Sequence, residues 1–180
     1  MRFLAVVAVA LAATQTWAPA AASDSSTRIE RRPALETSVI REINRVRASH
    51  GLGQLGAAPG LRTAARSHSR AMLLLGFFGH DSADGTAFSE RIKRYYPNRG
   101  WHRWSVGETL LARQGGAASA ADVVAAWLDS PPHRALILSP TWREAGVAAL
   151  YAPAAPKAFG GTETLVVTAD FGVRVARTSP

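Results

Sequence analysis

The hydrophobic residues of the chain repeat with helical spacing in its first half and gather into strand-like runs near its end. Val39, Ile43 and Val46 lie three or four positions apart, which predicts a helix over residues 35–50. A second helix is predicted over residues 59–76 by the same spacing. Its apolar face carries Leu61, Ala65, His68, Met72 and Leu75.

Two shorter helices are predicted farther along the chain, over residues 87–96 and 121–129. In the first, Phe88 and Ile92 are expected to face inward. Residues 98–105, between the two helices, are expected to form a loop. The second helix is expected to bury Val123, Val124, Trp127 and Leu128.

Two apolar runs near the C-terminal end, residues 147–151 and 165–171, predict the strands of a hairpin. Pro153, Pro156 and the pair Gly160-Gly161 lie between the runs and favour a long connecting loop. Helices followed by strands predict an α+β domain, in which helices cover a small antiparallel sheet.

The first residues of the chain have the composition of an export signal. Arg2 supplies a positive charge, residues 3–13 are almost wholly apolar, and Ala20-Ala21-Ala22 offers small residues for cleavage. We therefore expect a secreted protein without a transmembrane segment after cleavage, because the apolar run is too short for an anchor. The predicted divisions are a signal peptide (1–22), a linker (23–33), a folded domain (34–176) and a tail (177–180).

Composition narrows the partners of this domain. The 180-residue chain contains no cysteine, so it lacks disulfides and thiolate chemistry, and its hydrophobic content of 47% suits one packed domain. The net charge is +8, and removal of residues 1–22 takes away Arg2 and no acid, leaving +7. On an exported protein this charge favours anionic cell-envelope polymers or lipid headgroups. Nucleic acid is not expected, because the arginines are scattered and not interleaved with aromatic residues.

Ionisable residues beside a glycine, a proline or a structural break are candidates for a functional site. Ser130 is placed to cap a helix that begins at Pro131, with His133 in its first turn. The partial positive charge there favours neutral imidazole, the form that binds a metal or accepts a proton. Alternatively, these residues only cap and bridge structural elements, because no local metal motif joins them. The four candidates are His80, Glu108, His133 and Glu144.

A series of short motifs connects these candidates to a known family. In order they are Asn44-x-x-Arg47, Phe78-Gly-His80, Phe88 with Arg91, Gly107-Glu108, Trp127-x-x-Ser130-Pro-x-His133-Arg134 with Ile137-Leu138, Glu144-x-Gly146-Val147 and Asp170-Phe171-Gly172. Together they resemble the bacterial branch of the CAP superfamily (cysteine-rich secretory proteins, antigen 5 and pathogenesis-related 1, also called SCP-like extracellular proteins). The resemblance implies a three-layer α-β-α sandwich with a central cleft. In the family this cleft is lined by two histidines and acidic residues, and in some members the histidines bind a divalent metal such as zinc.

The resemblance also implies roles for individual residues. By position, the cleft histidines are His80 and His133, and one cleft acid is Glu108. Glu144 matches an acidic position typical of bacterial members, whereas eukaryotic members place their second acid at the tryptophan helix. Thr109 replaces the usual asparagine and so removes an amide that could brace the cleft. The supporting positions are Ser130, Asn44 and Arg47.

Two functions fit these residues. Two neutral imidazoles can supply zinc ligands at about 2.0–2.1 Å, and a carboxylate or water can complete the tetrahedron. With Glu108 as the candidate general base, this arrangement predicts a metal-assisted extracellular hydrolase. His68, on the apolar face of the second helix, is expected to be a hydrogen-bonded core residue and not a ligand.

The other function is a binding module for a lipid, a sterol or a cell-wall polymer, because the family lacks an agreed catalytic activity and its members are linked to sterol, fatty-acid and cell-wall binding. Aromatic residues expected at the surface fit that preferred interpretation: Trp101, Trp104 and Trp142. Alternatively, Trp101 is a core residue.

Overall fold

The computed structural model describes residues 28–176 of the chain, so the expected signal peptide, residues 23–27 of the expected linker and the expected tail lie outside the described residues. In chain order the elements are β1 (Glu30–Arg31), α1 (Pro33–Ser49), β2 (Gly56–Ala57), α2 (Pro59–Leu75), α3 (Phe88–Lys93), β3 (Trp101–Gln114), α4 (Ala120–Asp129), α5 (Pro131–Ile137), β4 (Glu144–Ala155), the 3-10 helix η1 (Lys157–Phe159) and β5 (Thr162–Ala176).

A single sheet organises these elements, with strand order β1-β4-β5-β3. The three pairings along this order are antiparallel, as predicted. The short strand β2 adds a parallel pairing to the start of β4, where Gly56 lies opposite Glu144. Because β3 ends the order, it is an edge strand, and side chains from both covering layers can reach it.

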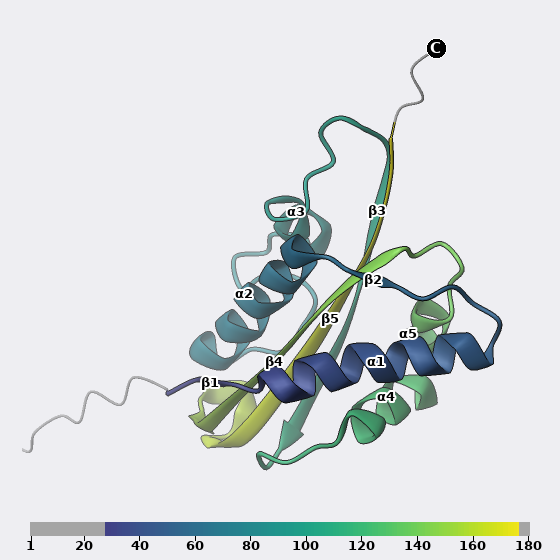
Figure 1. Cartoon of the computed structure of the whole chain (residues 1–180). Helices are drawn as coiled ribbons and strands as arrows, with labels where there is room; N and C mark the ends of the chain where they lie inside the picture. The colour runs from purple at the N-terminus through teal and green to yellow at the C-terminus, as the bar shows by residue number, and fades with distance from the viewer. Residues whose placement is uncertain (1–27, 177–180) are drawn as a thin grey trace, which may run out of the picture.

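Helices cover both faces of the sheet. Successive strand residues face opposite sides, so Val147, Val167 and Phe171 join one core with residues of α1, α4 and α5. Leu150 and Val166 join a second core with residues of α2. Figure 1 shows the strands running between α2 on one side and α1 with α4 on the other. The predicted α+β, three-layer α-β-α architecture is therefore confirmed.

The two long N-terminal helices follow their predicted ranges closely. Each begins with a proline at its first position, Pro33 in α1 and Pro59 in α2, where the missing N–H costs no hydrogen bond. Gly76 ends α2 with a φ of 68°, a left-handed conformation that glycine adopts without steric cost. Among residues 28–176, no helix is both long and apolar enough to cross a membrane.

Three strands of the structure, β1, β2 and β3, were not predicted from the sequence. Glu30–Arg31, expected in a linker, forms β1 and pairs with Leu150 and Tyr151. Residues 101–105, expected in a loop, belong to β3 and pair with the end of β5. In both places the partner strand is far away in the sequence, so local composition carries little signal of the pairing.

Candidate functional site

The centre of the site is the side chain of Glu108, which lies in β3 and is only 1% exposed. Its Oε1 lies 2.9 Å from Nδ1 of His80, and its Oε2 accepts a 2.6 Å hydrogen bond from Nη2 of Arg91. The His80 side chain is 47% exposed, so it is the member of this cluster that a ligand can reach. Both carboxylate oxygens of Glu108 are already engaged by protein groups.

The loop that follows α2 is held in place at several points. His68, buried in α2, lies with Nε2 2.8 Å from the carbonyl oxygen of Gly79. Since a carbonyl only accepts, this nitrogen carries the proton. Arg91 donates to the carbonyl oxygen of His80 at 3.2 Å. The prediction that His68 is a hydrogen-bonded core residue is confirmed, and its contact fixes the residue next to His80.

Electrostatics keep Glu108 ionised and favour the charged form of His80. Burial alone would raise the pKa of Glu108, but the His80 hydrogen bond and the Arg91 charge outweigh it and hold that pKa below its ordinary value. The same hydrogen bond raises the pKa of His80. Because an ionised carboxylate only accepts, Nδ1 of His80 donates to Glu108, and Nε2 is left for a ligand.

A second carboxyl group lies beside Glu108 and was not among the predicted site residues. Asp170 in β5 is opposite Glu108 in the strand register, is fully buried, and has no hydrogen-bond partner on either oxygen within residues 28–176. Burial and then the negative charge of Glu108 raise its pKa well above the ordinary value. The sequence signal that could have identified Asp170 is an acidic residue inside the mostly apolar run of residues 165–171.

His133 approaches the same edge of the sheet from the other layer. It lies in the first turn of α5 and is partly buried. Burial, and then the positive charge of His80, lower its pKa. A Cβ placed on Gly107 would come 2.6 Å from the Leu136 side chain, which shows how closely α5 lies against β3. The predicted neutral imidazole agrees with this shift, although burial is its main cause.

The expected cap at Ser130 is wrong in one respect. Ser130 occupies the N-cap position of α5, but its side chain makes no capping hydrogen bond. Its carbonyl oxygen accepts from the backbone N–H of Arg134 at 2.8 Å. By contrast, Ser119 and Asp122 form a reciprocal capping box at the start of α4. The backbone of the two prolines, Pro131 and Pro132, therefore directs α5 without help from the serine hydroxyl.

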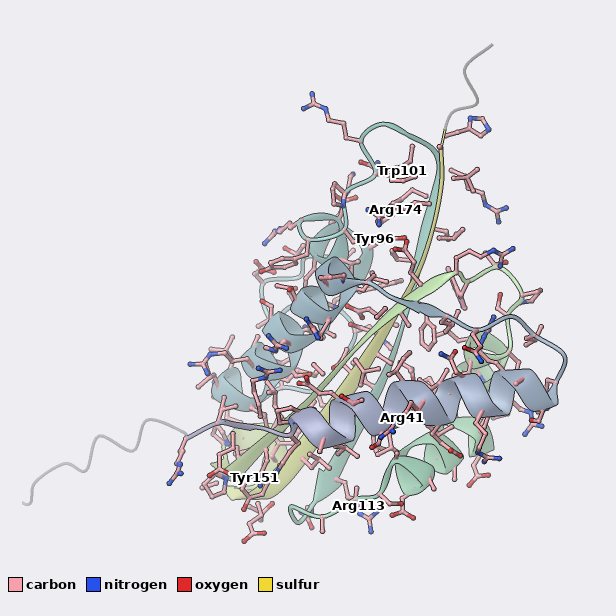
Figure 2. All side chains as sticks on the ribbon, viewed as in Figure 1. Arg41, Tyr96, Trp101, Arg113, Tyr151 and Arg174 are labelled. Carbon is pink, nitrogen blue, oxygen red and sulfur yellow. The ribbon has the colours of Figure 1, made fainter. Side chains whose placement is uncertain are left out.

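Glu144 belongs to a separate cluster. Its carboxylate accepts a short hydrogen bond from the Tyr96 hydroxyl and a 3.1 Å hydrogen bond from Nη2 of Arg174. The Arg174 guanidinium lies 4.0 Å from the ring centre of Tyr96 and 4.8 Å from that of Trp101. Figure 2 shows these three labelled residues together at one end of the molecule. The structure thus joins Glu144 to Tyr96 and Arg174, while His80 and Arg91 join Glu108.

The two other supporting residues hold backbone segments. The Asn44 side chain accepts from the Leu55 N–H at 2.8 Å and donates to the Leu55 carbonyl oxygen at 3.1 Å. Arg47 is 1% exposed and donates to the carbonyl oxygens of Ile137 and Ser139 at 2.7 and 2.9 Å. Arg47 therefore fixes the end of α5, the helix that carries His133.

The expected exposed tryptophans are mostly covered. Trp142 is 7% exposed and donates from its indole N–H to the Leu136 carbonyl oxygen, so the surface prediction is wrong there. Trp104 is partly buried and donates to the Tyr96 carbonyl oxygen. The indole N–H groups of Trp104 and Trp142 each find a backbone acceptor inside the fold, which favours burial over a surface platform. Trp101 is partly buried.

Comparison with known proteins decides the family. The family model of the cysteine-rich secretory proteins, abbreviated CAP, matches residues 40–171. The chain belongs to the CAP family. This match lies within the predicted domain and confirms the resemblance seen in the motifs. No curated protein matches the sequence of the chain.

Solved structures with the same fold come from three bacteria. An extracellular protein containing an SCP domain from Bacillus anthracis is 20% identical, with a TM-score of 0.59 over 81% of this chain and 41% of that one. An outer surface protein from Borrelia burgdorferi is 20% identical, with a TM-score of 0.64 over 82% and 98%. A cysteine-rich secretory protein from Staphylococcus aureus is 15% identical, with a TM-score of 0.52 over 79% and 39%. The chain spans less than half of the Bacillus and Staphylococcus proteins, and these identities show a shared fold alone.

The donor set of this CAP domain fits a metal only in part. Within residues 28–176, no group of three or more His, Cys, Asp or Glu side chains is placed to hold a metal ion. His80 and His133 supply two imidazoles, and Glu108 is already bonded to His80 and Arg91. Protein zinc sites usually have three or four protein ligands. A divalent cation held here would need its other ligands from water or from a bound molecule.

Proposed function

We propose that this CAP domain is an extracellular binding module, whose ligand site lies at the β3 edge of the sheet between His80 and His133. The observation that carries the proposal is the bonded pair of His80 and Glu108, a half-exposed imidazole oriented by a buried carboxylate. Membership of the family, the export signal expected over residues 1–22, and the extracellular and outer-surface proteins that share its fold support a location outside the cell.

The site would take a ligand that offers a hydrogen-bond acceptor or a coordinated cation. His80 presents Nε2 because Glu108 occupies Nδ1, and a carboxylate behind a histidine is the arrangement that orients metal-binding imidazoles. Zinc or another divalent cation is therefore proposed as an accessory, held by His80 and His133 together with exogenous ligands. A lipid, a sterol or a cell-wall polymer is the proposed ligand class, in line with the net charge of the chain.

Zinc binding tests the two histidines directly. The wild-type protein is expected to bind about one zinc ion in a calorimetric titration, since two imidazoles with exogenous ligands make one site. The double variant His80→Ala/His133→Ala should lose this binding. The double variant His50→Ala/His102→Ala is a matched control, because both of these histidines are exposed and lie outside the site. Equal zinc affinity in the wild type and the His80→Ala/His133→Ala variant would remove the metal from the proposal.

A metal-assisted extracellular hydrolase is the second candidate, favoured by the same orientation of His80. His80 and His133 would hold the metal, which would supply an activated water, and Glu108 would act by orienting His80, because it is buried with both oxygens engaged. If the protein is an enzyme, Glu108→Gln should lower turnover of an envelope polymer or ester by about 10²-fold or more without loss of folding. Saturable binding of a lipid or glycan, with no turnover by the wild type, would instead favour the binding module.

A further inference from the structure

A cavity at the end of the sheet has the chemistry of an anion site. It has a volume of about 530 Å³ and lies where β3, β5 and the segment before β4 meet. Its lining includes three arginines, a threonine and two valines, and it contains no acidic residue. The residues that matter to the argument are Arg103, Thr141, Arg143, Val173, Arg174 and Val175.

The arginines of this cavity differ in how their charge is balanced. Arg174 is paired with Glu144 at 3.1 Å. Arg103 and Arg143 have no carboxylate within ion-pair distance in the described part of the chain. Buried Arg47 is close by and is bonded only to carbonyl oxygens. Burial and then the charge of Arg143 lower the pKa of Arg47, so positive charge accumulates here without compensation.

The backbone holds Arg143 in a fixed position. Its Nη1 donates to the carbonyl oxygens of Pro140 at 2.6 Å and Trp142 at 2.9 Å. The backbone N–H of Arg143 also donates to Gly172 of β5 at 3.0 Å. The guanidinium is therefore ordered before a ligand arrives, and its Nε and Nη2 have no hydrogen-bond partner among residues 28–176. Such preorganisation reduces the entropy lost on binding.

Guanidinium groups recognise phosphate and carboxylate through paired N–H donors. Arg103 and Arg143 come from different strand ends, and a tetrahedral phosphate presents oxygens in several directions, whereas a planar carboxylate presents two. The volume of the cavity lies in the size range of small-molecule sites, about 300–1,000 Å³. The cavity is therefore larger than a single phosphate ion. We propose that this cavity binds the phosphate group of a larger molecule, through Arg103 and Arg143.

This site is separate from the cleft at His80 and His133, so the two proposals can fail independently. Binding is measured by calorimetry at low and physiological salt with inorganic phosphate, soluble poly(glycerol phosphate), and vesicles of phosphatidylglycerol against phosphatidylcholine. These arms distinguish free phosphate, a polymer phosphodiester and a lipid headgroup as sources. Amide signals of Thr141, Val173 and Val175 are expected to shift in the NMR spectrum when a phosphate probe is added.

Matched variants separate a specific site from general attraction by a basic protein. Arg103→Gln/Arg143→Gln is expected to weaken phosphate binding roughly 10- to 100-fold, the loss of charge-assisted hydrogen bonds. Arg41→Gln/Arg113→Gln removes the same charge elsewhere, on α1 and at the opposite end of β3 (Figure 2), and should bind like the wild type. If the double variant unfolds, Arg103→Gln alone tests the site, because the Arg103 side chain is exposed and its replacement should not affect folding.

Four results would overturn the proposal. The first is an absence of wild-type binding to every phosphate probe. The second is an equal loss of binding in the Arg103→Gln/Arg143→Gln and Arg41→Gln/Arg113→Gln variants, which would indicate attraction by net charge alone. The third is unchanged binding in both Arg103→Gln and the Arg103→Gln/Arg143→Gln variant. The fourth is a loss of phosphate binding in the His80→Ala/His133→Ala variant, which should retain it, because this loss would place the probe in the other cleft.

Discussion

Two glutamates on the same face of the sheet show how differently the fold treats similar residues. Glu108 and Glu144 lie two register positions apart, because Glu108 is opposite Asp170 and Glu144 is opposite Gly172. The side chain of Glu108 is 1% exposed and bonded to His80 and Arg91. The side chain of Glu144 is 28% exposed and paired with Arg174.

The segments that pack over each glutamate account for this difference in exposure. The loop before α3 and the helix itself bring His80 and Arg91 onto Glu108, so its charge is compensated inside the protein. Glu144 begins β4, where water still reaches its ion pair. When one partner of a buried ion pair is removed, the other charge is left without water or a counter-charge. At a partly exposed ion pair, water can replace the missing partner. The two pairs should therefore respond very differently to the same substitution.

Removal of the arginine partner is the largest expected effect. Arg91→Met would remove the buried arginine partner of Glu108 and leave its Oε2 without a hydrogen bond, at a cost of about 3–5 kcal/mol in the free energy of unfolding. Arg174→Met, the matched change at the other pair, should cost about 1 kcal/mol. Urea denaturation of both variants measures these values. Equal losses would contradict the contrast between the two glutamates.

A substitution at Asp170 should have an effect of intermediate size. Asp170 places a second carboxyl group beside Glu108, and Glu144 has no such neighbour in the strand register of residues 28–176. The raised pKa of Asp170 means that the folded protein holds a proton that the unfolded chain releases above about pH 4. The wild type therefore loses stability as the pH rises toward the folded-state pKa. Asp170→Asn should remove this loss, because an uncharged amide replaces an acid that faces Glu108 and Arg91.

The measurement for Asp170→Asn is the free energy of unfolding at pH 5 and pH 8. The gain in stability over the wild type should be larger at pH 8 than at pH 5. A difference that does not change with pH, or one that favours the wild type more at pH 8, would show that Asp170 is ionised in the folded protein.

The smallest effects concern two serines and extend the contrast between bonded and unbonded polar groups. Ser119 caps α4 through its side chain, whereas Ser130 makes no such bond at α5. Ser119→Ala should cost about 1 kcal/mol and Ser130→Ala less than about 0.5 kcal/mol. Thermal unfolding of the two variants compares them, and a larger loss at Ser130 would restore it as the cap of the helix that carries His133.

Local sequence predicted the parts of the fold that local interactions determine. The apolar spacing of residues 35–50 and 59–76 predicted α1 and α2 within a few residues, because each helix forms its own backbone hydrogen bonds. The strands β1, β2 and β3 were missed, because their partners lie in distant strands. Their pairing becomes visible only in the folded sheet.

The site was predictable to a smaller degree. His80, Glu108 and His133 were proposed through the family motifs, and the structure brings His80 onto Glu108. Arg91 occurs in one motif, but nothing in its local sequence places it against Glu108. Asp170 was overlooked as a site residue because its role depends on a cross-strand neighbour.

The most direct test of the account is an NMR titration of the histidine rings in the wild type, Glu108→Gln and Glu144→Gln. We predict that in the wild type His80 titrates above, and His133 below, the ordinary value of about 6.5. Glu108→Gln should lower the pKa of His80, whereas Glu144→Gln should leave it unchanged. An unchanged pKa of His80 in Glu108→Gln, or an equal shift in both variants, would contradict the claim that Glu108 and His80 form the core of the site.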